Sequence, residues 1–476
     1  MLFNSIEFII FLPIVFLLYW LAAKSTKLQN FLVVVASYIF YGWWDWRFLI
    51  LIVFTSLCSF GSGILIERYK ENRSLQKIIS ASNIIINLGI LGVFKYFNFF
   101  VDNLEILFET IGWHVDWVTS TIILPVGISF YTFQALSYSI DVYQKKIPAT
   151  HDLIEFCAYI SFFPQLVAGP IERATNLLPQ FQKSRCFDYS KAVDGCRQML
   201  WGFFKKLVIA DNCAFVVNEY WGDYSTMSGI SILVLGILFT FQIYCDFSGY
   251  SDIAIGCARL FGFNLMRNFH FPYFSRSIPE FWRRWHISLM TWLRDYIYFP
   301  LGGSKCRKRK AIRNTYIVWG ISGLWHGANW TFVCWGIYHA TILTVYKILN
   351  LSSKESEMRL VPKMKDVIKM FCTFIFVVIG WIVFRAENVS QAYDILNTMI
   401  ANCFIRPTDI HGLNFLGFAF ILMIIEWFQK EKPHALDFPV NRFFRYRIVR
   451  WCTYYIILLL IMKFTGESQT FIYFQF

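Results

Sequence analysis

The chain has 476 residues, of which 57% are hydrophobic, 20% aromatic and only 16% charged. This composition excludes a soluble globular protein, and it predicts an all-α polytopic membrane protein because apolar runs of bilayer-spanning length recur throughout. The net charge of +13 lies in short loops between these runs. That pattern is typical of cytoplasmic loops and argues against nucleic acid as a partner.

Eleven apolar runs are predicted to cross the membrane, and we expect them to form a single integral-membrane domain over residues 1–476. They cover residues 6–23, 28–44, 48–66, 78–101, 121–140, 152–170, 229–258, 314–347, 366–384, 413–428 and 446–463. The run at 314–347 is long for one span, so we expect a break near residues 327–329. Irregular backbone is tolerated at that depth where it lines a cavity.

Two further stretches, at 196–217 and 276–300, mix charged and apolar residues. Helices of this kind are tilted, re-entrant or interfacial. In the first stretch Lys205 and Lys206 stand among apolar residues, which favours an interfacial helix.

The charges of the loops predict the sidedness of the chain. Residues 68–77 are rich in Lys and Arg, whereas residues 102–116 carry four acidic residues and no basic one. By the positive-inside rule, the N-terminus is outside the cell and the loop near residue 70 is cytoplasmic. The loop at 305–313 has six basic residues and is expected to be cytoplasmic too.

The stretch from Phe281 to Trp330 is where chemistry is expected, because ionisable groups at membrane depth usually face a cavity or a partner. It begins FWRRWHISLMTWLRDYIYFPLGG. Read as one continuous helix, it places Trp285 on an aromatic stripe and His286, Arg283 and Arg294 on the adjoining face.

Two interpretations of these arginines stay open. One is an aromatic belt at the membrane interface with snorkelling arginines. The other is an electropositive mouth in which Arg283, Arg284 and Arg294 bind a phosphate-bearing thioester, such as coenzyme A, since Arg binds phosphate bidentately.

His326 stands in the segment LWHGANW, beside Trp325 and close to Asn329. A buried neutral imidazole could act as general base toward a hydroxyl. The alternative is a structural histidine that is hydrogen-bonded between helices. A metal site shared with His286 is less favoured, because no third ligand has suitable spacing.

Other intramembrane polar groups, such as Asp246 in CDFSGYSD and Gln165 in SFFPQLVAGPIER, could line a tunnel or join helices by hydrogen bonds. The chain has no GxSxG elbow, P-loop or dinucleotide motif, so direct transfer without a covalent enzyme intermediate is the simpler hypothesis. The twelve cysteines form no CxxC pair, and neither a metal nor a bound cofactor is expected.

These segments resemble the membrane-bound O-acyltransferase family. WRRWHISLMTWLRDYIYFPLGG and GLWHGANWTFVCWGIYHA carry the likeness, with LPVGISFYTFQ, FFPQLVAGPIER, IYCDFSGYSDIAIG and GWIVFRAE, and the signature core covers about 121–347. The likeness is to the bacterial branch that acetylates alginate or D-alanylates teichoic acid. It implies a ring of tilted helices around a central tunnel, with His326 as the buried family histidine and His286 as the second signature position.

The resemblance also implies a function at the bacterial cytoplasmic membrane. An acyl group, expected to be acetyl, enters as a cytoplasmic thioester of coenzyme A or an acyl carrier protein. It leaves on an extracytoplasmic acceptor, either a cell-envelope polysaccharide or a partner protein that relays it. Trp285, Trp325, Asn329, Asp246 and Gln165 are the expected substrate-binding residues beside the three arginines. The alternatives are D-alanyl transfer to teichoic acid, and a transporter or scaffold without chemistry, although the chain shows no paired repeats of the transporter kind.

Overall fold

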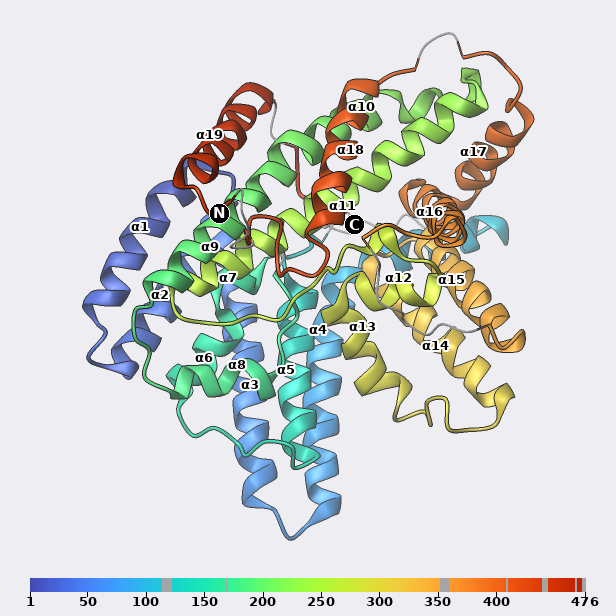
Figure 1. The fold of residues 1–476 in the computed structure, drawn as a ribbon. Coiled ribbons are helices and arrows are strands. Elements are labelled where there is room, and N and C mark those ends of the chain that lie inside the picture. The colour runs from blue at the N-terminus through green and yellow to red at the C-terminus, as the bar shows by residue number, and fades with distance from the viewer. Residues whose placement is uncertain are drawn as a thin grey trace. The chain divides into compact units, whose positions relative to one another are not determined.

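The computed structural model describes residues 1–113, 122–167, 169–351, 360–407, 410–438, 444–466 and 469–472, and within these ranges every regular element is a helix (Figure 1). The predicted all-helical membrane class is therefore confirmed. Four segments are long and apolar enough to span a bilayer: Thr26–Arg68, Arg73–Thr110, Gly229–Leu260 and Met364–Arg385. The predicted total of about eleven spans stays a prediction.

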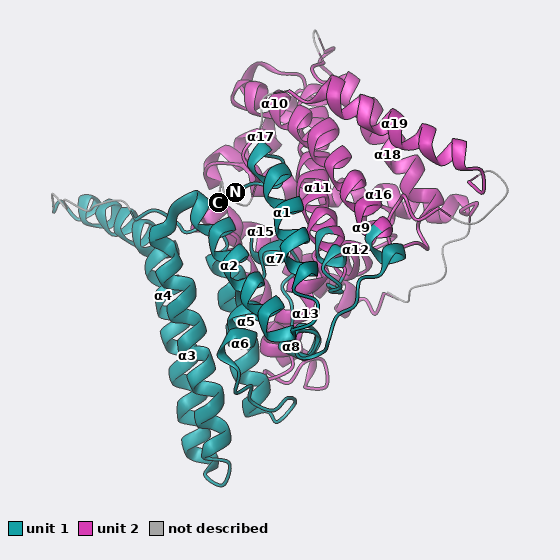
Figure 2. Ribbon diagram, turned by 90° about the vertical axis from the view of Figure 1, so that its left-hand side faces the viewer, with its two compact units in different colours: residues 1–192, 257–266 teal, residues 193–256, 267–476 magenta. Residues whose placement is uncertain are grey.

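The chain forms two compact units, shown in different colours in Figure 2. Unit 1 comprises residues 1–192 and 257–266, and unit 2 comprises residues 193–256 and 267–476. A single integral-membrane domain over the whole chain remains a prediction.

Unit 1 contains eight α-helices, a 3₁₀ turn (Trp46–Phe48), the first turn of the helix Tyr189–Phe203 and the last turn of the helix Gly229–Leu260, among the residues that the structure describes. The eight α-helices are α1 (Ile6–Leu21), α2 (Thr26–Asp45), α3 (Leu49–Arg68), α4 (Arg73–Thr110), α5 (Ile128–Tyr143), α6 (Leu153–Ser161), α7 (Phe163–Leu166) and α8 (Ala174–Gln182). The helix α4 has 38 residues, about 57 Å at 1.5 Å per residue, so it extends well past the predicted span at 78–101. Its first turn is capped by Asn72, whose side chain accepts from the Leu75 amide.

The run at 152–170 is not the single span predicted from its apolar composition. It forms the short helices α6 and α7, which are separated by non-helical backbone at Phe162. Nine residues of helix reach only about 14 Å, which is far less than the roughly 30 Å of a bilayer core. The prediction was wrong because an apolar run does not show where the backbone turns.

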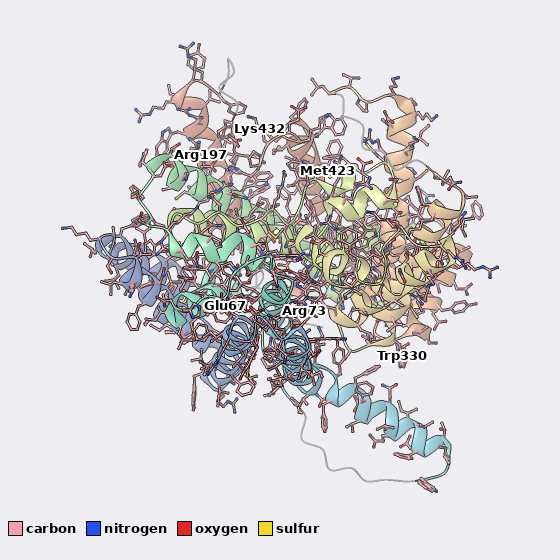
Figure 3. The ribbon with its side chains drawn as sticks, turned by 90° about the horizontal axis from the view of Figure 1, so that it is seen from below. Glu67, Arg73, Arg197, Trp330, Met423 and Lys432 are labelled. Carbon is pink, nitrogen blue, oxygen red and sulfur yellow. The ribbon has the colours of Figure 1, made fainter. Side chains whose placement is uncertain are left out.

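Two loops of unit 1 lie at the same end of the α3–α4–α5 group. The Arg73 guanidinium donates to the Tyr143 carbonyl at 2.7 Å, and His151 Nε2 lies 2.7 Å from a carboxylate oxygen of Glu67. Glu67 ends α3 and Arg73 begins α4, and both are labelled in Figure 3. The loops at 69–72 and 144–152 therefore lie at one end of this helix group.

Unit 2 contains most of α11 (Gly229–Leu260), an apolar helix of 32 residues, which is second in length to α4 among the described helices. Shorter helices make up the rest of the unit. Its elements are most of α9 (Tyr189–Phe203), a π-helical segment (Phe204–Ala210), α10 (Asp211–Tyr220), most of α11 (Gly229–Leu260), α12 (Ile278–Arg284), α13 (Ile287–Leu293), α14 (Lys308–His326), α15 (Trp330–Ile348), α16 (Met364–Arg385), α17 (Val389–Ala401), α18 (Leu413–Phe428) and α19 (Arg447–Phe464).

The predicted break near residues 327–329 is confirmed, because α14 ends at His326 and α15 begins at Trp330. The two helices then pack closely against each other. A Cβ on Gly336 would lie 2.4 Å from the Trp319 carbonyl oxygen, and one on Gly323 would lie 2.2 Å from the Phe332 carbonyl oxygen. Both glycines are therefore needed for this close approach, which holds His326 at the turn between two packed helices.

Candidate active site

The stretch around His286 is not the continuous helix predicted from the sequence. The helix α12 ends at Arg284, α13 begins at Ile287, and His286 between them has a left-handed backbone with φ of 45°. Such a conformation is uncommon for a residue with a Cβ. The predicted shared face of His286, Arg283 and Arg294 is therefore wrong, because no continuous helix joins these residues.

A cavity of about 560 Å³ lies at the three predicted arginines, and its volume is within the roughly 300–1,000 Å³ of small-molecule sites. Arg283, Arg284, Arg294 and Lys347 line it. Of these, Arg284 is buried and pairs with Glu280 at 2.8 Å, while Arg283 and Arg294 are exposed. The structure thus brings the three arginines together and adds a lysine that the sequence had not singled out.

The rest of the cavity wall is largely apolar. Its apolar lining residues are Trp282, Ile287, Met290, Val318, Trp319 and Leu343. At one corner the Lys347 ammonium lies 3.2 Å from the Tyr298 hydroxyl and also contacts the Thr315 hydroxyl. Cations beside an apolar wall suit a ligand that carries both phosphate and an acyl chain.

His286 is not among the residues that line this cavity, and only 1% of its surface is exposed. Its Nδ1 lies 3.1 Å from Asn268 Oδ1, and its ring packs edge-on against Phe247 at 4.6 Å between centroids and against Trp325 at 5.7 Å. It lies outside the four candidate spans, and burial lowers its pKa to about 3. The imidazole is therefore neutral at physiological pH.

His326 ends α14 and is 6% exposed. Its ring contacts Trp325 at 5.0 Å between centroids, Trp335 at 5.1 Å and Phe384 at 5.3 Å. Because Trp325 also contacts His286, the two histidines are neighbours across one indole ring.

A third histidine, His339, belongs to the same aromatic cluster, although it was not among the predicted site residues. Trp282 Nε1–H donates to His339 Nδ1 at 3.3 Å, and the His339 ring contacts Trp335 at 5.1 Å. Since Trp282 lines the cavity and Trp335 also contacts His326, this cluster connects the cavity wall to His326. The turn at 327–329 breaks the helical phase between His326 and His339, so their places in the cluster do not follow from their spacing in the sequence.

Two of the expected substrate-binding residues have structural contacts instead. Trp285 is 2% exposed and packs against Phe281, with ring centroids 5.5 Å apart. Asn329 caps α15, because its Oδ1 accepts from the Thr331 amide at 3.0 Å while its Nδ2 donates to the Glu387 carbonyl at 2.7 Å. Neither residue lines the cavity.

Asp246 and Gln165 are also buried among protein partners. Asp246 pairs with Lys206 at 2.8 Å and accepts from the Ile472 amide at 2.8 Å, both within unit 2. Gln165, in unit 1, donates to Gln134 Oε1 at 3.1 Å. Both therefore join elements by hydrogen bonds and ion pairs, which was the alternative to lining a tunnel.

The stretch with Lys205 and Lys206 is not an interfacial helix, because both side chains are buried in unit 2. Lys206 also pairs with Asp211 at 2.7 Å, and Lys205 pairs with Asp252 and donates to the Ser248 hydroxyl at 2.9 Å. Buried ammonium groups need such partners. The sequence could not show them, since the aspartates of α11 lie about forty residues away.

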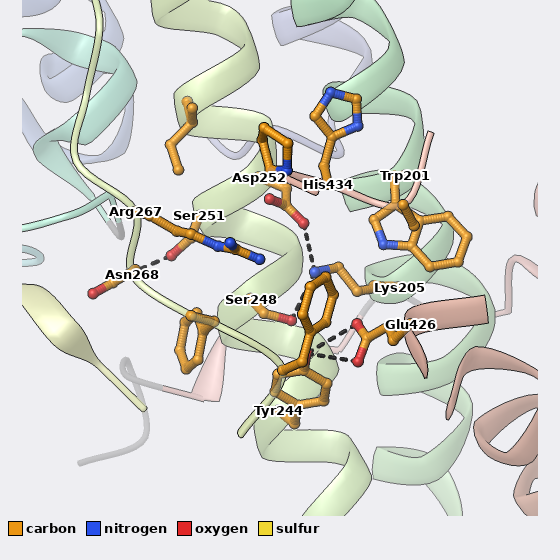
Figure 4. Close-up of a pocket in the computed structure, with 15 residues that line it drawn as sticks. Trp201, Lys205, Tyr244, Ser248, Ser251, Asp252, Arg267, Asn268, Glu426 and His434 are labelled. Carbon is orange, nitrogen blue, oxygen red and sulfur yellow. Dashed lines mark hydrogen bonds and ion pairs between the residues drawn. The ribbon is translucent and has the colours of Figure 1, made fainter. Parts of the chain in front are cut away.

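Lys205 lines a small charged chamber of about 20 Å³, which has room for about one water molecule (Figure 4). Figure 4 shows its ammonium between Asp252 and Ser248, with the Tyr244 hydroxyl donating to Glu426 at 2.9 Å nearby. The residues of this chamber were not predicted to lie together. The signal available was Glu426, an acidic residue inside the apolar run LMIIEWF.

The chain is similar to a known protein family and to several relatives. The model of the membrane-bound O-acyltransferase family matches residues 145–385. A probable alginate O-acetylase from Pseudomonas putida is 36% identical over 100% of both chains. A peptidoglycan O-acetyltransferase from Helicobacter pylori is 33% identical over 84% of this chain and 80% of its own. A teichoic acid D-alanyltransferase from Bacillus subtilis is 27% identical over 55% of this chain and 69% of its own.

Proposed function

This chain belongs to the membrane-bound O-acyltransferase family, and from that premise we propose that it transfers acetyl from a cytoplasmic thioester to hydroxyls of a cell-envelope polysaccharide. The enzyme class, an O-acyltransferase of the membrane, follows from the family. The acetyl group, the donor and the acceptor are our proposal. The relatives named for acetylation of alginate and of peptidoglycan support it, since they match more of this chain at higher identity than the D-alanyltransferase does.

The observation that carries the proposal is the cavity at Arg283, Arg284 and Arg294. A coenzyme A thioester presents phosphates for cations and a flexible chain for an apolar wall. The acetyl-bearing end would approach the aromatic cluster, in which Trp282 and Trp319 of the cavity wall contact Trp335. The thioester is thus a substrate and not a bound cofactor. Its alternative form is a thioester of an acyl carrier protein.

The transfer step needs a group that accepts one proton. The acceptor oxygen attacks the thioester carbonyl, a C–O bond forms, the C–S bond breaks, and the hydroxyl proton passes to a base and then to the departing thiolate. His326 is our candidate for that base, because its buried ring contacts Trp335, which in turn contacts the tryptophans of the cavity wall. His286, across Trp325, is the second histidine of the site.

The acceptor side follows from the proposed sidedness. We place the enzyme in the bacterial cytoplasmic membrane with the N-terminus outside, so that an inside donor meets an outside acceptor. Either the polysaccharide itself or an extracytoplasmic partner protein that relays the acetyl group fits this arrangement. D-alanyl transfer remains the second candidate reaction, supported by the more distant D-alanyltransferase relative.

Inside-out membrane vesicles supplied with radiolabelled acetyl-CoA test the proposal. We expect label in the envelope polysaccharide or in a partner protein, and no label with the variant His326→Ala at equal protein level. His151→Ala is the matched control, because His151 is an exposed histidine whose ring pairs with Glu67. It should leave transfer unchanged.

Each remaining outcome decides a part of the proposal. Label from an acetylated carrier protein but not from acetyl-CoA would replace the donor. Incorporation of D-alanine instead of acetyl would replace the acyl group. Normal transfer by His326→Ala would contradict the role of His326 as base.

A further inference from the structure

Asn268 holds the turn at His286 through several hydrogen bonds. Its backbone oxygen accepts from the Ile287 amide at 2.9 Å, and its side-chain Oδ1 accepts from the Ser288 amide at 3.3 Å and the Ser288 hydroxyl at 2.9 Å. The same Oδ1 lies 3.1 Å from His286 Nδ1. Asn268 is fully buried, so these bonds have no competition from water, and they fix both the left-handed backbone and the ring of His286.

These contacts also determine where the imidazole carries its proton. The Ser288 amide can only donate, so the Asn268 atom that it faces must be the oxygen, which rules out a flipped amide. An amide oxygen can only accept, so His286 Nδ1 must carry the hydrogen in the 3.1 Å contact. In the neutral ring, Nε2 then holds the lone pair.

We propose that Asn268 is a positioning residue that presents His286 Nε2 as a hydrogen-bond and proton acceptor during acyl transfer. This inference rests on the proposed function and deepens it. It makes His286 an acceptor of a hydrogen bond or proton, and not a donor to the negatively charged oxygen that forms when the thioester carbonyl is attacked. His339 has the opposite tautomer, since its Nδ1 accepts from Trp282 and its proton must lie on Nε2. The two buried histidines are therefore not interchangeable.

The surroundings of His286 bear on its protonation. The rings that pack on it belong to Phe247 of α11 and Trp325 of α14, and His326 follows Trp325 on the same helix. The helix α12, which precedes it, contributes Arg283 and Arg284 at the cavity. On the far side, Asn268 Nδ2 donates to the Ser251 hydroxyl at 3.2 Å, and Ser251 lines the charged chamber. The titratable groups of that chamber are Lys205, Tyr244, Asp252, Arg267, Glu426 and His434.

The tautomer can be measured without any substrate. The full chain, labelled with ¹⁵N-histidine and held in detergent or lipid, should show one histidine with a protonated Nδ1 and an unprotonated Nε2. That signal should disappear in His286→Gln, which assigns it. A protonated Nε2 on His286 in the unaltered protein would overturn the inference, whatever the enzyme transfers.

Kinetics test the acceptor role. With acetyl-CoA as donor, Asn268→Ala should lower kcat by about 100-fold, the scale of acid–base assistance. Asn268→Asp keeps an acceptor at the same place and adds a negative charge that stabilises the imidazolium. It should therefore retain most of kcat but move the acid limb of the pH–rate profile upward by about one unit or more, because His286 must be neutral to accept a proton.

Asn212→Ala is the matched control, because Asn212 is an asparagine of the same unit whose Nδ2 donates to the Phe464 carbonyl at 2.9 Å and which does not line the cavity. It should change kcat by less than about threefold and leave the pH profile in place. A purely structural Asn268 predicts instead that Asn268→Asp and Asn268→Ala lose folded protein together without a pH shift, which would overturn the proposal. Full activity of His286→Ala with the tautomer as expected would overturn the role in transfer and leave the acyltransferase proposal standing.

Discussion

The cations of the cavity differ in what they are able to contribute. Arg284 already pairs with Glu280, which also pairs with Arg276, so its charge is largely compensated within the protein. Arg283 and Arg294 are exposed side chains on the cavity wall, and Arg294 has the adjacent carboxylate of Asp295 at 2.7 Å. An incoming phosphate would therefore gain most from Arg283 and Arg294, because ion pairs of exposed side chains contribute little that the phosphate would have to replace.

The double variant Arg283→Gln, Arg294→Gln should raise the KM for acetyl-CoA by about tenfold and leave kcat nearly unchanged. These contacts act on parts of the donor remote from the reacting bond, so they stabilise the bound substrate and the transition state alike. Steady-state transfer at varied acetyl-CoA concentration measures both constants.

Two controls distinguish a loss of phosphate binding from a general loss of transfer activity. Lys308→Gln removes a nearby cation that does not line the cavity, and it should leave the KM unchanged. S-acetyl-N-acetylcysteamine has the thioester but no phosphate, so both proteins should use it equally well. An equal loss with that small donor would contradict phosphate recognition by the arginines.

At the level of single residues, the sequence predicted that the arginines lie together but not the geometry around His286. The three arginines share a cavity as expected, but His286 was placed on the wrong face. Its left-handed turn depends on Asn268, which lies outside the stretch from Phe281 that was predicted to be one helix. Trp285 and Asn329 were included for their position beside the histidines, and sequence adjacency does not reveal that one packs in the core and the other caps a helix.

Among elements, the α14–α15 pair matters most for the site. It carries His326 at its turn and Trp319, Trp335 and His339 on its packed faces. Its two helices approach so closely that Gly323 and Gly336 each lie against a backbone carbonyl of the other helix. The position of the aromatic cluster therefore depends on glycine at this contact.

Gly336→Ala should destabilise the protein, because the added Cβ would meet the Trp319 carbonyl at 2.4 Å and backbone cannot give way cheaply. Overpacking of this kind costs about 1–3 kcal/mol. We expect a lower Tm for the detergent-solubilised protein, measured by fluorescence-detected size exclusion after heating. Transfer activity should fall as well, since Trp335 and His339 lie on the displaced helix.

Gly320→Ala is the matched control on the partner helix. A Cβ there has no atom within 4 Å, and replacing a helical glycine by alanine is favourable by about 0.5–1 kcal/mol. Its Tm should stay the same or rise. An equal Tm loss in both variants would show that the close contact between α14 and α15 is not what Gly336 provides.

Local signals predicted some elements and missed others for a physical reason. The excessive length of the 314–347 run and its Gly327 indicated the break before Trp330, because both are properties of the run itself. The turn at Phe162 and the burial of Lys205 could not be inferred in this way. Each depends on distant partners: Phe163 donates its amide to Ser37 in unit 1, and Lys205 pairs with Asp252 in unit 2.

For the whole molecule, the decisive question is which face of the membrane the donor enters from. In unit 1, the Met1 nitrogen lies 3.0 Å from the Phe40 carbonyl, so residue 1 is at the opposite end of the α1–α2 pair from the turn at 22–25. In unit 2, Lys308 donates to the Ile348 carbonyl at 3.3 Å, next to the cavity residue Lys347. The basic loop at 305–313 and the cavity therefore belong to one face.

Cysteine labelling tests that sidedness. In a background without the native cysteines, Glu71→Cys and Lys305→Cys should react with an impermeant maleimide only in inside-out vesicles, and Glu109→Cys only in right-side-out vesicles. The loops of Glu71 and Lys305 are basic, so the positive-inside rule predicts that they stay in the cytoplasm. The helix α4 is long enough to span the bilayer, so its acidic end with Glu109 is expected on the other side. Reaction of Glu71→Cys and Glu109→Cys from one side would mean that α4 does not cross the membrane. Reaction of Lys305→Cys from outside would place the cavity on the outer face, where acetyl-CoA is absent, and a cytoplasmic thioester could then not be the donor.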